Sequence, residues 1–246
     1  MTASIVALDL ETVLDADLGR RALGLGGSDD GVLRDAMRGY WLNKTQGRSD
    51  FLPPVFHRVV AVGSARYETD GREIRDFSAW SVATGDERGC LVAALRLLEG
   101  RPQLVTWNGG GFDLAVLRHR CLTHGVSLLP FYAPRERGQD DYLYRYGRAH
   151  VDLMDTLSGY GAAPRSALHD VAVACGLPGK GDVTGADVES LVRDGKWEEL
   201  RRYVEQDAVT TLLLHLRFEA VTGRLPKQAF TEARKHFGLE PESVEA

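Results

Sequence analysis

Acidic residues near the N-terminus are spaced so that their side chains could act together. Asp9 and Glu11 lie two residues apart at the end of an apolar stretch, Ser4–Leu10. Residues i and i+2 of a strand point to the same face, so the two carboxylates would project side by side. Adjacent carboxylates repel each other unless one is protonated or a cation lies between them. Taken alone, the pair fits a solvated strand end better than a functional site.

A glycine-rich loop leads to a third acid. Gln103–Trp107 is predicted to be a strand, Asn108–Gly111 a tight loop, and Asp113 lies in the first turn of the following helix, Phe112–His124. Glycines let a backbone turn sharply and let a ligand approach it closely. An acid in the first turn also stabilises a helix through its dipole, so this motif alone leaves both roles open.

The longest helical pattern, Trp197–Thr222, carries a tyrosine and an acid on one face. Tyr203 and Asp207 are four residues apart, which places them one turn from each other. The adjacent stripe is apolar and consists of Val204, Ala208, Leu212 and Leu216. An Asp close to a core costs free energy unless it is paired or bound to a metal. The alternative is a surface Asp paired with Arg201 or Arg202.

The elements that must position these residues follow an α/β order. Three strands and a helix are followed by a fourth strand and then mainly by helices. A turn at Asp70–Gly71 predicts a hairpin between two of the strands, so the sheet should contain both antiparallel and parallel pairs. The predicted strands are Ser4–Leu10, Val55–Gly63, Glu73–Trp80 and Gln103–Trp107. The further predicted helices are Arg88–Glu99, Asp152–Leu157, Ala167–Cys175 and Ala186–Arg193.

Two segments differ from the rest of the chain. Val13–Pro54 is rich in glycine, has two Asp-rich patches and only one weak helical segment near Val32–Tyr40, so it is predicted to be an insertion or lid. The long helix is predicted to end at Gly223, with Pro226 just beyond it. We therefore expect one domain over residues 1–225, with the insertion at 13–54, and a C-terminal tail over 226–246.

The composition is that of a soluble globular protein. Of the 246 residues, 43% are hydrophobic and 26% charged, and no apolar run is long enough to span a bilayer. The N-terminus lacks a basic segment typical of signal peptides, so a cytoplasmic location is expected. Three dispersed cysteines argue against a disulfide framework or zinc knuckle. The net charge of −5 counts mildly against a nucleic-acid binder.

The three motifs, in this order, resemble the DEDD superfamily of 3′→5′ exonucleases. Asp-x-Glu at 9–11, Asn-xxx-Phe-Asp at 108–113 and Tyr-xxx-Asp at 203–207 look like its tyrosine-bearing branch. Within that branch the chain resembles bacterial proteins described as predicted exonucleases related to the exonuclease domain of family B polymerases. The resemblance runs from about Ile5 to Thr222 and departs slightly around Asp207. Further segments that carry it are Phe56–Ala61, His150–Asp155, Leu168–Asp170, Gly176–Gly181 and Gln206–Thr211.

This resemblance implies an RNase H-like fold, with a mixed five-stranded sheet flanked by helices and a helical second half. It also implies metal-dependent hydrolysis that releases nucleoside monophosphates, with two divalent ions, Mg²⁺ or Mn²⁺. Asp9, Glu11 and Asp207 would hold one ion, and Asp9 with Asp113 would serve the other. Tyr203 would orient the attacking water.

Other residues are candidate substrate ligands. Thr12 could donate to the 3′ end, and Asn108 could fix its loop or touch the terminal nucleotide. Phe112 could stack on a base, although packing is favoured, and Lys180 could contact a phosphate or be solvated. His150, Asp152, His169 and Asp170 are interpreted as structural.

The expected partner is a single strand of DNA or RNA with a free 3′ end. DNA ranks slightly above RNA because of the resemblance to proofreading domains, so a 3′→5′ exoribonuclease is the first alternative. The others are an inactive nucleic-acid-binding module and a phosphatase or endonuclease on the same fold. The acidic net charge predicts weak, salt-sensitive binding beyond the terminal nucleotides.

Overall fold

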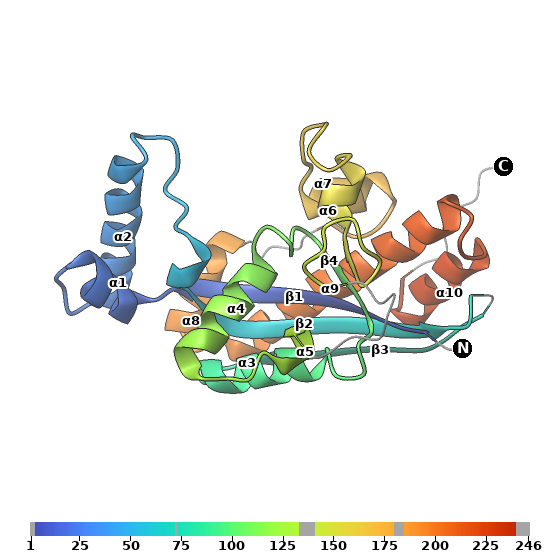
Figure 1. Cartoon of the computed structure of the whole chain (residues 1–246), viewed down its shortest axis with the longest axis horizontal. Coiled ribbons are helices and arrows are strands. Elements are labelled where there is room, and N and C mark those ends of the chain that lie inside the picture. The colour runs from blue at the N-terminus through green and yellow to red at the C-terminus, as the bar shows by residue number, and fades with distance from the viewer. Residues whose placement is uncertain (1–2, 72, 133–140, 180–184, 240–246) are drawn as a thin grey trace.

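Five strands form one mixed sheet at the centre of the molecule (Figure 1). The computed structural model describes residues 3–71, 73–132, 141–179 and 185–239. Strand order is β3-β2-β1-β4-β5, with β2 antiparallel to β1 and β3, and β4 parallel to β1 and β5. The mixed five-stranded α/β sheet predicted from the sequence is confirmed. The strands are β1 Ala3–Leu14, β2 His57–Thr69, β3 Ile74–Ala83, β4 Gln103–Thr106 and β5 His150–Asp152.

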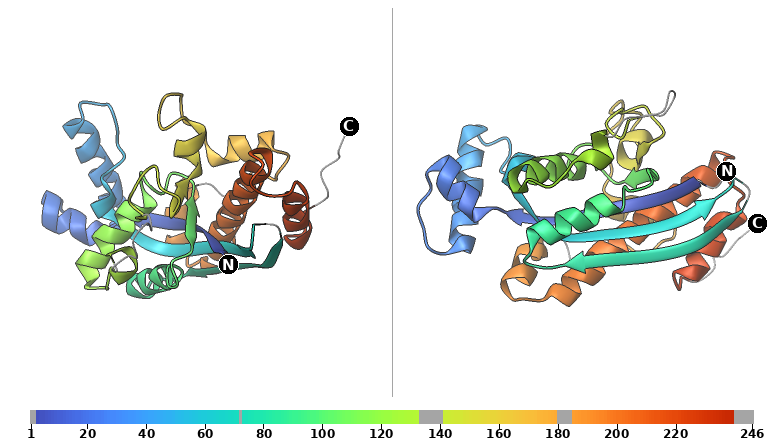
Figure 2. Two further views of the ribbon diagram at one scale, coloured as in Figure 1. Left: turned by 45° about the vertical axis from the view of Figure 1, so that its right-hand side comes forward. Right: turned by 60° about the horizontal axis from the view of Figure 1, so that its bottom comes forward.

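The central strand β1 is buried on both faces because helices cover both sides of the sheet. Ile5 and Ala7 join a core cluster with the long helix α9 (Trp197–Val221), whereas Leu8 and Leu10 join a cluster with α3 (Glu87–Arg96) and α4 (Asp113–His124). Figure 2 shows α4 and α9 on opposite sides of the sheet. The period of two along β1 therefore decides which side chains face α9.

Most predicted helices are found within one or two residues of their expected bounds. Further described helices are α5 Leu129–Tyr132, α6 Leu153–Leu157, α7 Leu168–Ala174, α8 Val188–Arg193 and α10 Gln228–His236, with 3₁₀ turns at Pro54–Phe56 and Gly185–Asp187. The short strand β5 was not predicted as a strand from its residues. α10 lies in the segment expected to be a tail, and it packs against α9 through Phe230 and Ala233.

The segment predicted to be an irregular insertion is more ordered than expected. β1 does not end at Leu10 but continues to Leu14, whose partner in β2 is His57. Two helices follow, α1 (Ala16–Leu23) and α2 (Asp30–Lys44), and they project from one end of the sheet (Figure 1). Each begins with an aspartate that accepts a hydrogen bond from a backbone N–H in the first turn. Their small core is Leu14, Met37, Leu52 and Phe56.

A buried ion network attaches this pair of helices to the body of the protein. The Arg120 guanidinium on α4 donates to both carboxylate oxygens of Glu87 on α3, at 2.7 and 2.6 Å, and lies 2.8 Å from Asp15. Asp15 also caps α1 by accepting from the N–H of Leu18 at 3.0 Å. Removing one member of a buried ion pair typically costs about 3–5 kcal/mol, so this network fixes where α1 starts.

None of the described helices is long and apolar enough to cross a membrane.

Candidate active site

Asp9 and Glu11 lie where β1 extends beyond its parallel neighbour. The pairing of β1 with β4 ends at Ala7 and Val105, so the two acids follow directly on the β4 side. They continue the series of Ile5 and Ala7 and therefore face α9. A register shift between Glu11 and Thr12 bends the strand just after the acids.

Gly63 lets α9 approach this part of the sheet. In β2, Gly63 is the direct partner of Asp9. A Cβ at this position would lie 2.2 Å from the carbonyl oxygen of Val204 and 2.6 Å from its carbonyl carbon. The backbone of α9 therefore crosses β2 at a distance that no other residue type would permit. Because Val204 lies between Tyr203 and Asp207, this contact fixes against β2 the part of α9 that carries both side chains.

Three of the four acids predicted as ligands form one cluster. Asp9, Glu11 and Asp207 each offer a carboxylate oxygen, and these atoms all lie within 4.8 Å of one another. Asp207 is buried, whereas Asp9 and Glu11 are half-buried. In the described part of the chain this is the one group of three or more metal-ligating side chains at such spacing. An all-oxygen donor set of this kind fits Mg²⁺ or Mn²⁺ better than zinc.

Asp113 reaches the same strand from the other face of the sheet. It begins α4, is only 6% exposed and accepts a hydrogen bond from the backbone N–H of Leu10, the residue between Asp9 and Glu11. Burial raises the pKa of Asp113 to about 7, and the negative charge of Asp152 adds to the shift. This carboxyl thus contacts β1 between Asp9 and Glu11, although it is not among the three carboxylates that lie within 4.8 Å of one another.

Asp152 holds the loop that carries Asp113. Its carboxylate accepts from the N–H of Asn108 at 3.0 Å and from that of Gly110 at 2.9 Å. Asn108 has a φ of 65°, and a Cβ on Gly111 would lie 2.6 Å from its Oδ1. The loop thus turns tightly at Asn108, whose side-chain oxygen lies against Gly111. Asp152, interpreted as structural from the sequence, supports the site in this indirect way.

Tyr203 lies one turn before Asp207 on α9. Its side chain is 8% exposed and belongs to a core cluster with Val13, Val60 and Val204. The ring is therefore fixed by packing, so the position of its hydroxyl is set by β1 and α9 rather than by a mobile loop.

A cavity of about 350 Å³ adjoins Glu11 and contains Thr12 and Phe112, two of the predicted substrate ligands. The Thr12 hydroxyl lies 3.1 Å from Nδ1 of His57. The Phe112 ring lies 4.9 Å from the His57 ring and 5.4 Å from Phe51, whose side chain is 60% exposed. Sequence reasoning missed Phe51 and His57 as part of this wall, and the only local signal was an aromatic residue just before a predicted strand. Lys180 lies outside the described residues.

Comparison with known proteins identifies the family. A family model described as "Predicted 3'-5' exonuclease related to the exonuclease domain of PolB" matches residues 49–238. The chain belongs to this family. Members are predicted exonucleases, so the resemblance drawn from the sequence motifs is confirmed. No curated protein matches the chain.

A solved structure confirms the fold. The family B DNA polymerase from the hyperthermophilic archaeon Pyrobaculum calidifontis matches with a TM-score of 0.54 and 20% identity over 85% of this chain. The chain corresponds to only 24% of that polymerase. The RNase H-like exonuclease fold is therefore shared. The family match begins after β1, so the roles of Asp9 and Glu11 depend on the geometry described above.

Proposed function

We propose that this exonuclease is metal-dependent and removes nucleoside monophosphates from the 3′ end of single-stranded nucleic acid, with DNA favoured over RNA. The observation that carries the proposal is the cluster of Asp9, Glu11 and Asp207, with Asp113 bordering it. Carboxylates of this density are destabilising by themselves, because like charges repel and Asp207 is buried. A site that binds cations explains why the fold brings them together.

The donor set fits two divalent ions, Mg²⁺ or Mn²⁺. Asp9, Glu11 and Asp207 would hold one, and Asp9 with Asp113 would serve the second. When bound, such ions lower the pKa of a water molecule and offset charge on the departing oxygen. The buried carboxyl of Asp113, with its raised pKa, would lose its proton on the arrival of a cation.

Tyr203 is proposed to position the attacking water. Its ring is packed in the core one turn from Asp207, so the hydroxyl has a fixed direction. A neutral phenol is sufficient for this role, because it can donate and accept a hydrogen bond. Tyr203 therefore need not act as a base.

The cavity beside Glu11 is proposed to receive the terminal nucleotide. At about 350 Å³ it lies at the small end of ligand pockets. Phe51 and Phe112 offer ring faces for a base, and the Thr12 hydroxyl could donate to the 3′ end. An ion pair between Arg38 of α2 and Glu189 of α8 borders the cavity. A cavity bounded in this way favours a chain end over a continuous strand.

The test is hydrolysis of 5′-labelled single strands in Mg²⁺ or Mn²⁺, with DNA and RNA of one sequence in parallel. A linear strand should shorten stepwise from its 3′ end, whereas a closed circle of the same sequence should remain intact. A strand with a blocked 3′ end should stall. Cutting of the circle, or shortening from the 5′ end, would contradict the proposal and favour an endonuclease. Faster cutting of RNA would reverse only the ranking of substrates.

A further inference from the structure

Three exposed tyrosines lie together near β5, and neither the fold nor the proposed chemistry requires them. Tyr144, Tyr146 and Tyr160 are 54%, 59% and 40% exposed. The ring of Tyr146 lies 6.1 Å from that of Tyr144 and 4.8 Å from that of Tyr160, both edge to face. We call these three residues the tyrosine surface. Exposed aromatic groups that gather in one place, rather than singly, are typical of binding surfaces.

The tyrosine surface is held in place by an arginine beneath it. Arg145 donates two hydrogen bonds to the Asp155 carboxylate, at 2.6 and 2.7 Å, and a third to the carbonyl oxygen of Tyr160 at 2.9 Å. Its guanidinium also lies 5.9 Å from the Tyr146 ring and 5.8 Å from the Tyr160 ring. A bidentate pair of this kind fixes geometry as well as charge. The rings are thus presented in a preorganised arrangement, which lowers the entropic cost of binding a ligand.

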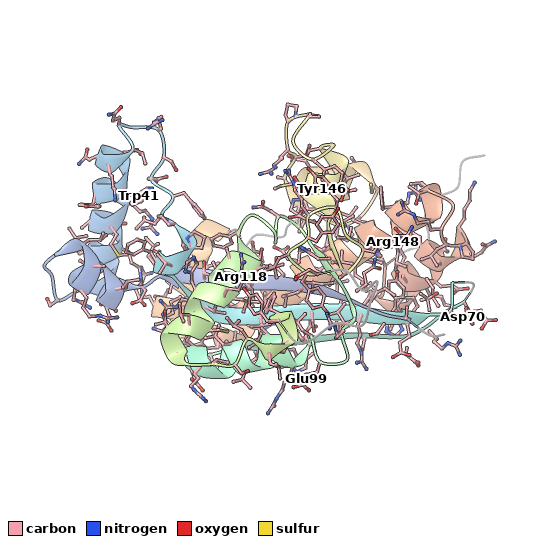
Figure 3. The ribbon with its side chains drawn as sticks, viewed as in Figure 1. Trp41, Asp70, Glu99, Arg118, Tyr146 and Arg148 are labelled. Atoms are coloured by element: carbon pink, nitrogen blue, oxygen red, sulfur yellow. The ribbon has the colours of Figure 1, made fainter. Side chains whose placement is uncertain are left out.

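A cavity links the tyrosine surface to the loop that carries Asp113. It measures about 360 Å³, and its wall includes Gly110, Gly111 and Arg145. Tyr146 and Tyr160 line a second cavity, which shares Arg145 with the first. Arg118 on α4 and Arg165 also line it. Figure 3 shows Tyr146 above the sheet and Arg118 on α4, between Tyr146 and Glu99 in this view. The cavity thus extends from the loop that carries Asp113 to the arginine that contacts two of the tyrosines.

The charge of this cavity is opposite to that of the chain. Three guanidinium groups, those of Arg118, Arg145 and Arg165, face the carboxylates of Asp152 and Asp155. Both Arg145 and Arg165 pair with Asp155, and Arg118 has no carboxylate partner within the described ranges. A positive surplus in a chain of net charge −5 is a local feature that suits an anionic ligand.

We propose that the tyrosine surface binds nucleotides upstream of the last three, so that their bases stack on Tyr144, Tyr146 and Tyr160. Their phosphates would follow Arg118 and Arg165. Aromatic faces beside a basic groove are the usual means of binding single strands without regard to sequence. This inference rests on the proposed exonuclease function and adds to it a second contact region for the substrate.

The inference modifies the expectation that an acidic chain binds upstream nucleotides only weakly. Stacking does not depend on phosphate contacts, so affinity can come from the rings while the number of ionic contacts stays small. Binding should therefore have a shallow dependence on salt, and the salt dependence should come from the arginines rather than the tyrosines.

Substrate length tests the inference. With a 15-nucleotide strand, Tyr146→Ala should raise KM about tenfold and leave kcat unchanged, since one stacking contact is lost away from the chemistry. With a trinucleotide, too short to reach the tyrosine surface, the same variant should match the wild type. Tyr146→Phe keeps the ring and should behave as wild type on both. Tyr132→Ala is the matched control, because Tyr132 on α5 is 56% exposed and outside this surface.

A binding assay tests the inference even if no strand is cut. Anisotropy of a labelled 15-mer, measured without divalent metal over a salt series, should show about tenfold weaker binding for Tyr146→Ala with an unchanged slope. Arg118→Gln should reduce the slope of log K against log salt by about 0.7, one phosphate contact. Equal KM changes on the 15-mer and trinucleotide, or equal losses in Tyr132→Ala, would overturn the inference. Melting temperatures confirm that each variant is folded. A wild type that binds the 15-mer but cuts nothing contradicts the proposed function alone.

Discussion

The substitution Gly63→Ala adds a single methyl group at the point where α9 crosses β2. The new Cβ would lie 2.2 Å from the carbonyl oxygen of Val204. Because comfortable contacts between such atoms are about 3.5 Å, the helix or the strand must move by roughly 1 Å. The obstacle is helix backbone rather than a flexible side chain, so no rotamer change can relieve it. Val204 lies three residues before Asp207, whose carboxylate would shift with the helix.

This displacement should affect catalysis more than stability. A misplacement of 1 Å in a site of this kind can cost about 10²-fold in rate, so kcat should fall by about that factor. Overpacking of a core costs about 1–3 kcal/mol, which corresponds to a decrease in Tm of roughly 2–12 °C for a chain of this size. The assay is initial hydrolysis of a labelled single strand over a Mn²⁺ titration. The variant should need more Mn²⁺ than the wild type, since the distance from Asp207 to Asp9 increases.

Gly39→Ala is the matched control for this prediction. Gly39 is an exposed residue within α2, and a Cβ there would meet nothing within 4 Å. Alanine in a helix interior is more stable than glycine by about 0.5–1 kcal/mol, so Tm should rise slightly and kcat should not change. A Gly63→Ala enzyme with wild-type kcat and wild-type metal requirement would refute the argument that this glycine positions α9.

Three further substitutions test individual side chains. Asp207→Asn should abolish hydrolysis. The Tm of this variant without metal should stay level or rise, because repulsion between the clustered carboxylates falls. Wild-type turnover would exclude Asp207 as a metal ligand. Tyr203→Phe should slow hydrolysis about 10²-fold at saturating metal while metal binding persists in a titration; an unchanged rate would remove its hydroxyl from the mechanism. Burial lowers the pKa of His215 to about 4, with a smaller effect from Arg224. The folded protein therefore keeps His215 neutral, whereas the unfolded chain protonates it below pH 6.5. The free energy of unfolding should fall by on the order of 3 kcal/mol between pH 6.5 and pH 4. His215→Gln should show a flatter Tm profile over this range by calorimetry, and parallel profiles would contradict the assignment.

The sequence predicted those parts of the fold that local patterns determine. The strands before Asp9 and Trp107 are apolar runs, and the hairpin at Asp70–Gly71 follows from turn chemistry. The long helix α9 was found nearly to its ends because a glycine at 223 and a proline at 226 terminate it. Such signals come from residues that are close together in the chain, so they can be recognised without knowledge of tertiary contacts.

The parts that were missed depend on contacts between distant segments. β1 extends to Leu14 because residues from His57 onwards pair with it, which no local pattern indicates. α1 and α2 carry several glycines, which lower intrinsic helix propensity, yet they are stabilised by the Asp15–Arg120 contact and by a small shared core. β5 has only three residues, so its alternation was too short to predict a strand.

The candidate site shows the same division. Residue type and spacing singled out Asp9, Glu11 and Asp207 as candidates, but each motif alone left a structural role open. Only the order of the three motifs and their resemblance to the exonucleases joined them into one predicted site. The role of Gly63 could not be predicted, since a glycine within a strand is equally consistent with a bulge. Only the structure shows that the backbone of Val204 packs directly against Gly63, which is why this position requires a glycine.

Asp113 and Asp155 differ in how the fold balances their charge, and that difference determines what each carboxyl can do. Asp155, on the tyrosine-surface side, has a lowered pKa because Arg145 and Arg165 donate to it, so it remains a structural anion with its own counter-charge. Asp113 is buried with two backbone N–H donors and a like charge nearby, and its pKa is raised instead. A carboxyl in that condition is stable either with a proton or with a cation. The fold thus pairs Asp155 with two arginines, which keeps its charge fixed, and buries Asp113, whose charge we propose is balanced by a bound cation.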